Sequence, residues 1–247
     1  MEFTKKEINH LAIAIFVLGV IFSFKEWGAE EFSLLYGIKN LLRAIIISSI
    51  ILLTQIYTEK WVGKKLNISV FYTLWVVEPF FVFKHFVKDK VYLGVIVPLL
   101  LSLASNGALT LPIVGGFSSH EDQSKRIGRR FSRLTEFEEG RISFIGMISN
   151  LLWIIIFKVL TLTGLPFFDK GMEIGAFILM INILPLPPLN GSKIFFGSRS
   201  FYVFSLIFMV ASVICLYTFS IIVSLIIAAV TAIIISVLYY HHKEYSQ

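Results

Sequence analysis

The stretch Met180–Gly191, which reads MINILPLPPLNG, ends a run of apolar residues and contains signals that stop a helix. Three of its residues are prolines, Pro185, Pro187 and Pro188. Proline lacks the backbone N–H that a helix needs and restricts the residue before it. In hydrocarbon a broken helix is tolerated only inside protein or beside a cavity, because unpaired backbone groups are costly there. The stretch therefore predicts either a site that carries Asn182 and Asn190 or a plain interfacial turn capped by these asparagines.

The composition indicates a membrane protein. The chain has 247 residues, of which 56% are hydrophobic and 15% charged, and its mean hydropathy is +0.81. Soluble domains carry about 25% charged residues. Residues 44–56 and 201–240 form long apolar runs. We therefore predict an all-α polytopic membrane protein, with about 6–8 transmembrane or re-entrant segments around a core with a proline-broken helix.

Charged residues predict the topology. The net charge is +6, and the basic residues lie in the loops between apolar runs. The positive-inside rule explains this pattern better than nucleic-acid binding does, so we expect membrane lipids as partners and no nucleic acid. Residues 58–67 are then cytoplasmic and the acidic loop 25–36 is outside. The N- and C-termini are both predicted to be cytoplasmic, in a multi-pass protein integral to the cell membrane.

The apolar runs predict three regions. Residues 1–36 hold a membrane anchor helix and a short loop, because no small-residue cleavage pattern follows the first apolar run. Residues 37–200 form the membrane core and include a cytoplasmic loop, 117–141. Residues 201–247 form a pair of transmembrane helices that turns near 217–220. The predicted spans are 10–24, 37–57, 142–163, 171–185 and the two halves of 201–240.

Two segments fit no simple span. Residues 70–83 are too short for an upright helix and are broken at Glu78-Pro79, so they predict a tilted helix or a re-entrant hairpin. Residues 91–113 are interrupted by Pro98, Asn106-Gly107 and Pro112. If both segments span, or both re-enter, residues 117–141 return to the cytoplasm.

Three stretches resemble motifs of the site-2 protease family of intramembrane zinc metalloproteases, in its short archaeal-type form. Residues 182–191 resemble the family's N-x-x-P-x-x-x-x-D-G box. Residues 145–150 (IGMISN) are similar to its A-G-P-x-x-N element, and residues 55–66 resemble its zinc helix, H-E-x-x-H with a lysine-rich exit. The likeness covers about residues 40–200 and implies a site-2-protease-like membrane core.

The resemblance does not extend to the zinc chemistry. The places of the two zinc-binding histidines hold Gln55 and Glu59, the place of the catalytic glutamate holds Ile56, and that of the ligating aspartate holds Asn190. Neutral amide oxygens are poor zinc ligands, and isoleucine transfers no proton. The resemblance therefore implies a pseudoprotease with no catalytic residue, no bound metal and no cofactor.

Our leading hypothesis is a catalytically inactive homologue that binds a transmembrane segment or a partner subunit through a retained intramembrane groove. Pro185 would help to fix the opening of that groove. The residues expected to line it are Gln55, Glu59, Asn150, Asn182 and Asn190. Asn150 and Asn182 match polar positions of the family. Gln55 and Asn190 are expected to hydrogen-bond across helices, as zinc would bridge them in the family.

Three alternatives remain open from the sequence. Glu59 could contact Gln55 or Asn190 inside the membrane, or instead mark the interface beside Lys60. The chain could be an active intramembrane metalloprotease whose remodelled metal site recruits Glu59 with His85 or His120. It could also be a small transporter or channel, in view of its broken helices and Glu78.

Overall fold

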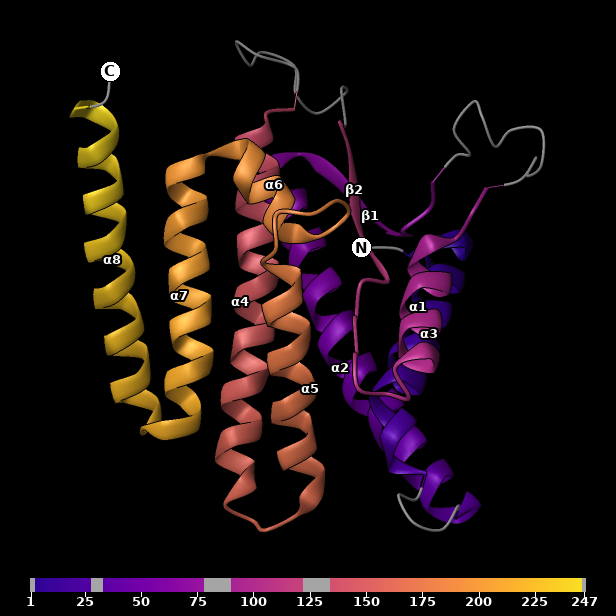
Figure 1. Ribbon diagram of the computed structural model, residues 1–247. Coiled ribbons are helices and arrows are strands. Elements are labelled where there is room, and N and C mark those ends of the chain that lie inside the picture. The colour runs from indigo at the N-terminus through magenta and orange to yellow at the C-terminus, as the bar shows by residue number, and fades with distance from the viewer. Residues whose placement is uncertain (1–2, 28–32, 78–89, 122–133, 246–247) are drawn as a thin grey trace. The chain divides into compact units, whose positions relative to one another are not determined.

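The computed structural model describes residues 3–27, 33–77, 90–121 and 134–245 (Figure 1). Among these residues five helices are long and apolar enough to cross a membrane. They are α1 (Lys5–Ser23) with the 3-10 helix η1 (Phe24–Glu26), α2 (Leu34–Leu66), α4 (Glu136–Thr161), α7 (Arg199–Thr218) and α8 (Ile221–Tyr245). The remaining elements are β1 (Ile68–Leu74), α3 (Leu93–Ala104), β2 (Gly115–Glu121), α5 (Pro166–Asn182) and α6 (Asn190–Gly197). The protein is thus mostly helical.

The chain divides into two compact units. Unit one comprises residues 1–53 and 71–118, and unit two comprises residues 54–70 and 119–247. Helix α2 and both strands contribute residues to each unit.

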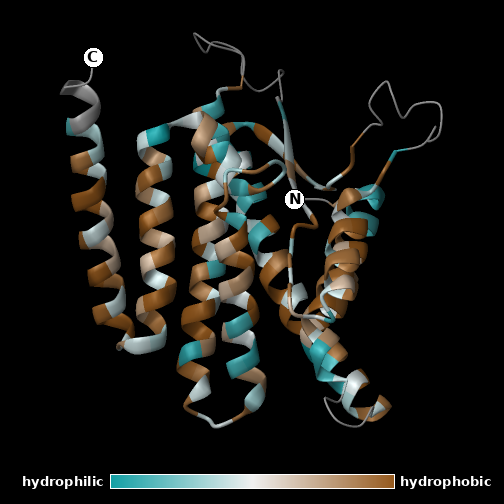
Figure 2. Ribbon diagram, in the orientation of Figure 1, coloured by the Kyte–Doolittle hydropathy of each residue, from teal (hydrophilic) through white to brown (hydrophobic). Residues whose placement is uncertain are grey.

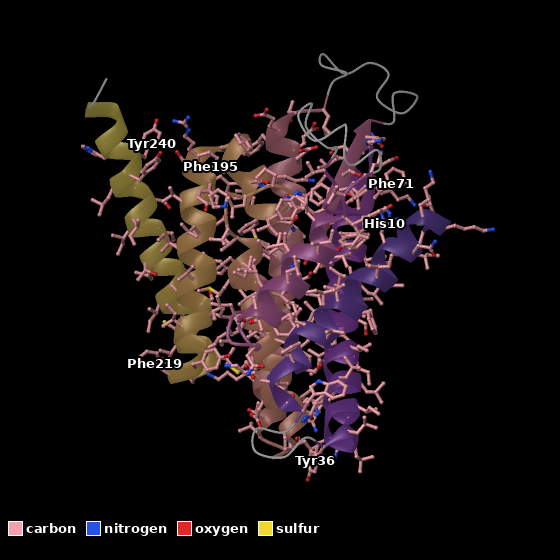
Figure 3. The ribbon with its side chains drawn as sticks, turned by 45° about the vertical axis from the view of Figure 1, so that its right-hand side comes forward. His10, Tyr36, Phe71, Phe195, Phe219 and Tyr240 are labelled. Atoms are coloured by element: carbon pink, nitrogen blue, oxygen red, sulfur yellow. The ribbon has the colours of Figure 1, made fainter. Side chains whose placement is uncertain are left out.

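In unit one, a buried glutamate ties the start of α1 to the first strand. Thr4 and Glu7 form a capping box, in which the Glu7 N–H donates to Thr4 Oγ1 at 3.3 Å. The Oε1 atom of the Glu7 carboxylate accepts the Tyr72 N–H at 3.0 Å, in a buried hydrogen bond. Helices α1 and α3 pack side by side (Figure 1). His10 and Phe71 lie toward one end of this unit, and Tyr36 lies at the other (Figure 3).

The mostly helical structure agrees with the all-α prediction, but β1 and β2 also form a two-stranded sheet that the prediction did not include. Residues 70–74, predicted as part of a tilted helix or re-entrant hairpin, lie in a strand whose side chains are alternately buried and half-buried. This alternation is the period of two that a half-buried strand requires. Thr73 pairs with Gly116 and Phe71 with Ser118, so the strands are antiparallel. The predicted break at Glu78-Pro79 lies outside the described residues.

The segment 91–113 contains one short helix. Helix α3 has 12 residues and is therefore about 18 Å long, well short of the roughly 30 Å of a hydrocarbon core. Pro98 lies within α3, so the prediction that it interrupts the segment is wrong. The predicted break at Asn106-Gly107 is confirmed, because both residues have positive φ angles just after the helix ends. Strand β2 covers residues 115–121, so the predicted loop 117–141 begins inside a strand. Its last residues, 136–141, belong to α4.

In unit two, α4 packs against α5, α6 and α7, and α7 packs against α8 (Figure 1). Helix α7 ends at Thr218 and α8 begins at Ile221, which confirms the predicted helix pair and its turn. Both helices are mainly hydrophobic along their length (Figure 2). Phe195 and Tyr240 lie at one end of this unit and Phe219 at the other (Figure 3). The start of α4 and the end of α8 share the first of these ends (Figure 1).

The proline-rich stretch breaks the chain between α5 and α6. Helix α5 ends at Asn182, so the predicted stop before Pro185 is confirmed. With 17 residues, α5 is not among the five candidate spans, although residues 171–185 were predicted to form one. A Cβ on Gly171 would lie 2.9 Å from the Phe157 ring, so this glycine lets α5 approach α4 closely. A Cβ on Gly191 would lie 2.0 Å from the Ile183 carbonyl oxygen, so only glycine allows α6 to start beside the end of α5.

Candidate functional site

Helix α2 supplies two buried polar side chains. Gln55 and Glu59 are one helical turn apart and therefore share a face of the helix. Gln55 is 5% exposed and Glu59 is 0% exposed. The Gln55 Nε2 group donates to Glu59 Oε1 at 2.9 Å. The predicted contact between Glu59 and Gln55 is therefore confirmed, and the full burial of Glu59 argues against a carboxylate that snorkels to solvent.

Two asparagines extend this pair to neighbouring helices. Asn150 of α4 donates its Nδ2 group to Gln55 Oε1 at 2.7 Å, and Asn182 of α5 donates to the same oxygen at 3.3 Å. The Oδ1 atom of Asn182 accepts the backbone N–H of Asn190 at 3.1 Å. The first residue of α6 is therefore tied to the last residue of α5 across the prolyl break.

Asn190 closes the network on α2. Its Nδ2 group donates to Glu59 Oε1 at 2.6 Å and lies 3.5 Å from the backbone oxygen of Ser143 on α4. The sequence predicted a direct bond between Gln55 and Asn190, but the structure has both amides donating to Glu59 instead. The reason is that Glu59 lies between them and offers a carboxylate oxygen. We call Gln55, Glu59, Asn150, Asn182 and Asn190 the polar cluster.

Gly146 makes room for the carboxylate. A Cβ at this position of α4 would lie 2.3 Å from Glu59 Oε1 and 2.7 Å from Glu59 Cγ, far inside van der Waals contact. Sequence reasoning quoted Gly146 only as part of the IGMISN stretch and gave it no role. Its place four residues before Asn150, on the same face of the helix, was the signal that could have identified it.

One acidic side chain fixes the orientation of the whole cluster. A carboxylate only accepts hydrogen bonds, so Gln55 and Asn190 must turn their NH2 groups toward Glu59. Gln55 then presents its oxygen, to which Asn150 and Asn182 must donate. The oxygens of Asn150 and Asn190 consequently face away from these bonds.

Four buried oxygens around the cluster have no hydrogen-bond partner within the described part of the chain. They are Glu59 Oε2, Ser143 Oγ, Asn150 Oδ1 and Asn190 Oδ1. Buried polar groups are normally paired, because leaving one unpaired costs about 1–3 kcal/mol. The cluster therefore has unused capacity to accept hydrogen bonds or to coordinate a cation.

A lysine that sequence reasoning missed lies near the cluster. Lys193 is half-buried on α6, which is not among the candidate spans. Burial lowers its pKa to about 8, while attraction to the charges of Glu139 and Glu59 acts in the opposite direction. Its place three residues after Asn190, and thus on the same face of α6, was the available signal.

The other candidate residues lie elsewhere. Pro185 is exposed in the segment between α5 and α6. His120 is exposed, and its Nδ1 atom lies 2.6 Å from the backbone oxygen of Ser119. His85 and Glu78 fall outside the described residues. Within the described ranges, no group of three or more His, Cys, Asp or Glu side chains could hold a metal ion.

Comparisons with known proteins identify no relative. The sequence matches no protein-family model and no curated protein, and the structure matches no solved structure. The chemistry of the polar cluster is therefore the main guide to function.

Proposed function

We propose that the chain is a catalytically inactive homologue of the site-2 proteases that binds a transmembrane segment of a partner protein without cleaving it. The polar cluster is the binding site, and an unwound stretch of the partner's backbone is the group it recognises. Such a stretch presents backbone N–H groups that have lost their helical acceptors.

The observation that carries this proposal is the hydrogen bonding of Glu59 to both Gln55 and Asn190. These three residues hold the places that the resemblance gives to the zinc ligands. The stretches that carry the resemblance are far apart in sequence, yet their side chains meet at one buried point. Asn150 and Asn182, which match polar positions of the family, join the same network. Buried, unpaired oxygens are suitable acceptors for the N–H groups of an unwound segment.

Binding requires the cluster to open. None of its five residues is more than 9% exposed, so a segment reaches them only after a neighbouring element moves. The prolyl segment between α5 and α6 is the candidate for this movement, because residues 185–187 are exposed and lack regular structure. The fixed φ angles of Pro185, Pro187 and Pro188 limit the conformations that this turn can adopt.

Binding of synthetic transmembrane peptides in lipid nanodiscs tests the proposal. One peptide carries a central Asn-Gly pair that favours unwinding, and the other is a uniform leucine–alanine helix. Energy transfer from the tryptophans of the protein to a labelled peptide reports binding, and mass spectrometry reports peptide length. We expect the Asn-Gly peptide to bind more tightly, by about tenfold, and to remain intact.

Variants of the cluster make the test specific. Asn150→Ala removes a cluster side chain and should reduce the preference for the Asn-Gly peptide. Ser212→Ala, which changes a buried polar residue of α7, is the matched control and should leave that preference unchanged. Cleavage of either peptide would contradict the proposal, and so would equal binding of both.

A further inference from the structure

Three of the unpaired oxygens belong to Asn190 and to the two residues that its side-chain amide contacts, Glu59 and Ser143. The Asn190 amide donates to Glu59 and lies against the backbone oxygen of Ser143. Each of these residues also carries a buried oxygen without a partner, namely Glu59 Oε2, Ser143 Oγ and Asn190 Oδ1. Glu59 and Ser143 are 0% exposed and Asn190 is 1% exposed. These oxygens come from a carboxylate, a hydroxyl and an amide, on three different helices.

This set of atoms favours a hard cation as its ligand. Oxygen-only sites suit hard cations, whereas zinc prefers imidazole and thiolate. The oxygens belong to buried residues, which favours a small ligand such as a single ion over a bulky one.

We propose that a hard monovalent cation binds among Glu59, Ser143 and Asn190, with Glu59 Oε2, Ser143 Oγ and Asn190 Oδ1 as protein ligands. One carboxylate balances one positive charge, while Ca²⁺ usually takes 6–8 oxygen ligands with several carboxylates. The ion stabilises the closed form of the cluster by pairing oxygens that are otherwise buried alone. This binding uses two residues of the polar cluster, Glu59 and Asn190, but it concerns the closed form and needs no partner.

Salt-dependent thermal unfolding of the purified protein in detergent tests the inference. Unfolding is measured in NaCl, KCl and choline chloride at equal ionic strength, without any peptide present. We expect Na⁺ or K⁺ to raise the unfolding temperature saturably over choline. The rise should be about 3–6 °C at about ten times the dissociation constant. Equal unfolding temperatures in all three salts would overturn the inference.

A serine variant tests the position of the ion. Ser143→Ala removes one ligand but leaves the bond between Glu59 and Asn190, so its half-saturating cation concentration should rise about tenfold. Ser212→Ala is the control, because it also deletes a buried hydroxyl without a partner among the described residues, but on α7. An identical cation response in the wild-type protein and Ser143→Ala would contradict the assignment.

Direct binding of radioactive sodium to the wild-type protein keeps the test decisive if Ser143→Ala fails to fold. Scintillation proximity would show saturable binding of about one ion per chain, displaced by unlabelled Na⁺, Li⁺ or K⁺ but not by choline. Absence of saturable binding for both Na⁺ and K⁺ would overturn the inference. Because no peptide is used, that result would leave the proposed partner binding to its own test.

Discussion

At the scale of single residues, Glu59 organises the polar cluster. Its carboxylate accepts hydrogen bonds from the amides of Gln55 and Asn190. Gln55 therefore turns its oxygen toward Asn150 and Asn182, which donate to it. A buried carboxylate that is well hydrogen-bonded can be tolerated, whereas removing its acceptor atoms leaves the donors unpaired. The energetic importance of Glu59 thus lies in the partners that depend on it.

Replacing Glu59 with leucine should destabilise the protein more than replacing it with glutamine. Leucine removes the acceptor that the NH2 groups of Gln55 and Asn190 share and leaves Asn190 only its 3.5 Å contact with the Ser143 backbone oxygen, which should cost about 2–4 kcal/mol. Glutamine retains one acceptor oxygen and should cost less. Thermal unfolding in detergent measures both effects. A Glu59→Leu protein as stable as the wild type would show that the cluster contributes nothing to the fold.

The contact between Gly146 and Glu59 can be tested as a pair. Gly146→Ala places a methyl group where the carboxylate lies, and should destabilise the protein by about 1–3 kcal/mol. In a Glu59→Ala background the space is free, so the same change should have little further effect. A double-mutant cycle of unfolding free energies measures this coupling. Additive effects would mean that the two residues do not touch.

At the scale of elements, the prolyl break between α5 and α6 places Asn190 in the polar cluster. Helix α6 can start beside the end of α5 because Gly191 has no side chain. Gly191→Ala would push a methyl group against backbone atoms of Ile183, which cannot rotate away. We expect a loss of at least about 2 kcal/mol or a failure to fold. Phe196→Leu, at an exposed position of the same helix, is the control and should unfold like the wild type.

Lys193 gives α6 a pH dependence with a defined sign. Its pKa of about 8 lies below the ordinary lysine value of 10.5, so between these values the unfolded state binds more protons than the folded state. The stability of the wild type relative to Lys193→Met should therefore rise as the pH rises from about 8 to about 10.5. Unfolding temperatures of the two proteins across this range test the direction. A difference that falls with pH would contradict it.

The sequence predicted the elements with strong local signals. The prolines at 185, 187 and 188 stop a helix in any environment. The apolar run 201–240 is twice as long as one membrane span, so it must turn once. The strand β1 was missed although the buried Ile68, Val70, Tyr72 and Leu74 alternate with three half-buried residues, Ser69, Phe71 and Thr73. Its seven residues lie between apolar segments, so the membrane pattern obscured a period of two.

The hydrogen bonds of the site were harder to predict than the identity of its residues. The motif spacings selected Gln55, Glu59, Asn150, Asn182 and Asn190, and the structure brings all five into one hydrogen-bonded network. The sequence did not give the pattern of bonds, because whether Asn190 reaches Gln55 or Glu59 depends on how the helices pack. Ser143 and Lys193 belong to none of the motif positions; Ser143 is identified by its contact with Asn190, and Lys193 by its place one turn after Asn190 and its attraction to Glu59.

At the scale of the whole molecule, the described residues include five helices long and apolar enough to span a bilayer, together with short elements that no membrane pattern requires. In unit two, the start of α4 and the end of α8 lie at the same end, as the predicted topology requires (Figure 1). The cytoplasmic location of that end stays a prediction. The helices that the proposed resemblance matches to the zinc-binding helices of a protease hold a hydrogen-bonded polar cluster in this protein.

Zinc content measured by mass spectrometry, for the wild type and for a variant with the family's ligands restored, tests this claim most directly. The variant combines Gln55→His, Ile56→Glu, Glu59→His and Asn190→Asp. The account predicts no stoichiometric zinc in the wild type and about one zinc per chain in the restored variant, because the ligands would then have the required type and placement. Tightly held zinc in the wild type, or a folded restored variant without zinc, would contradict it.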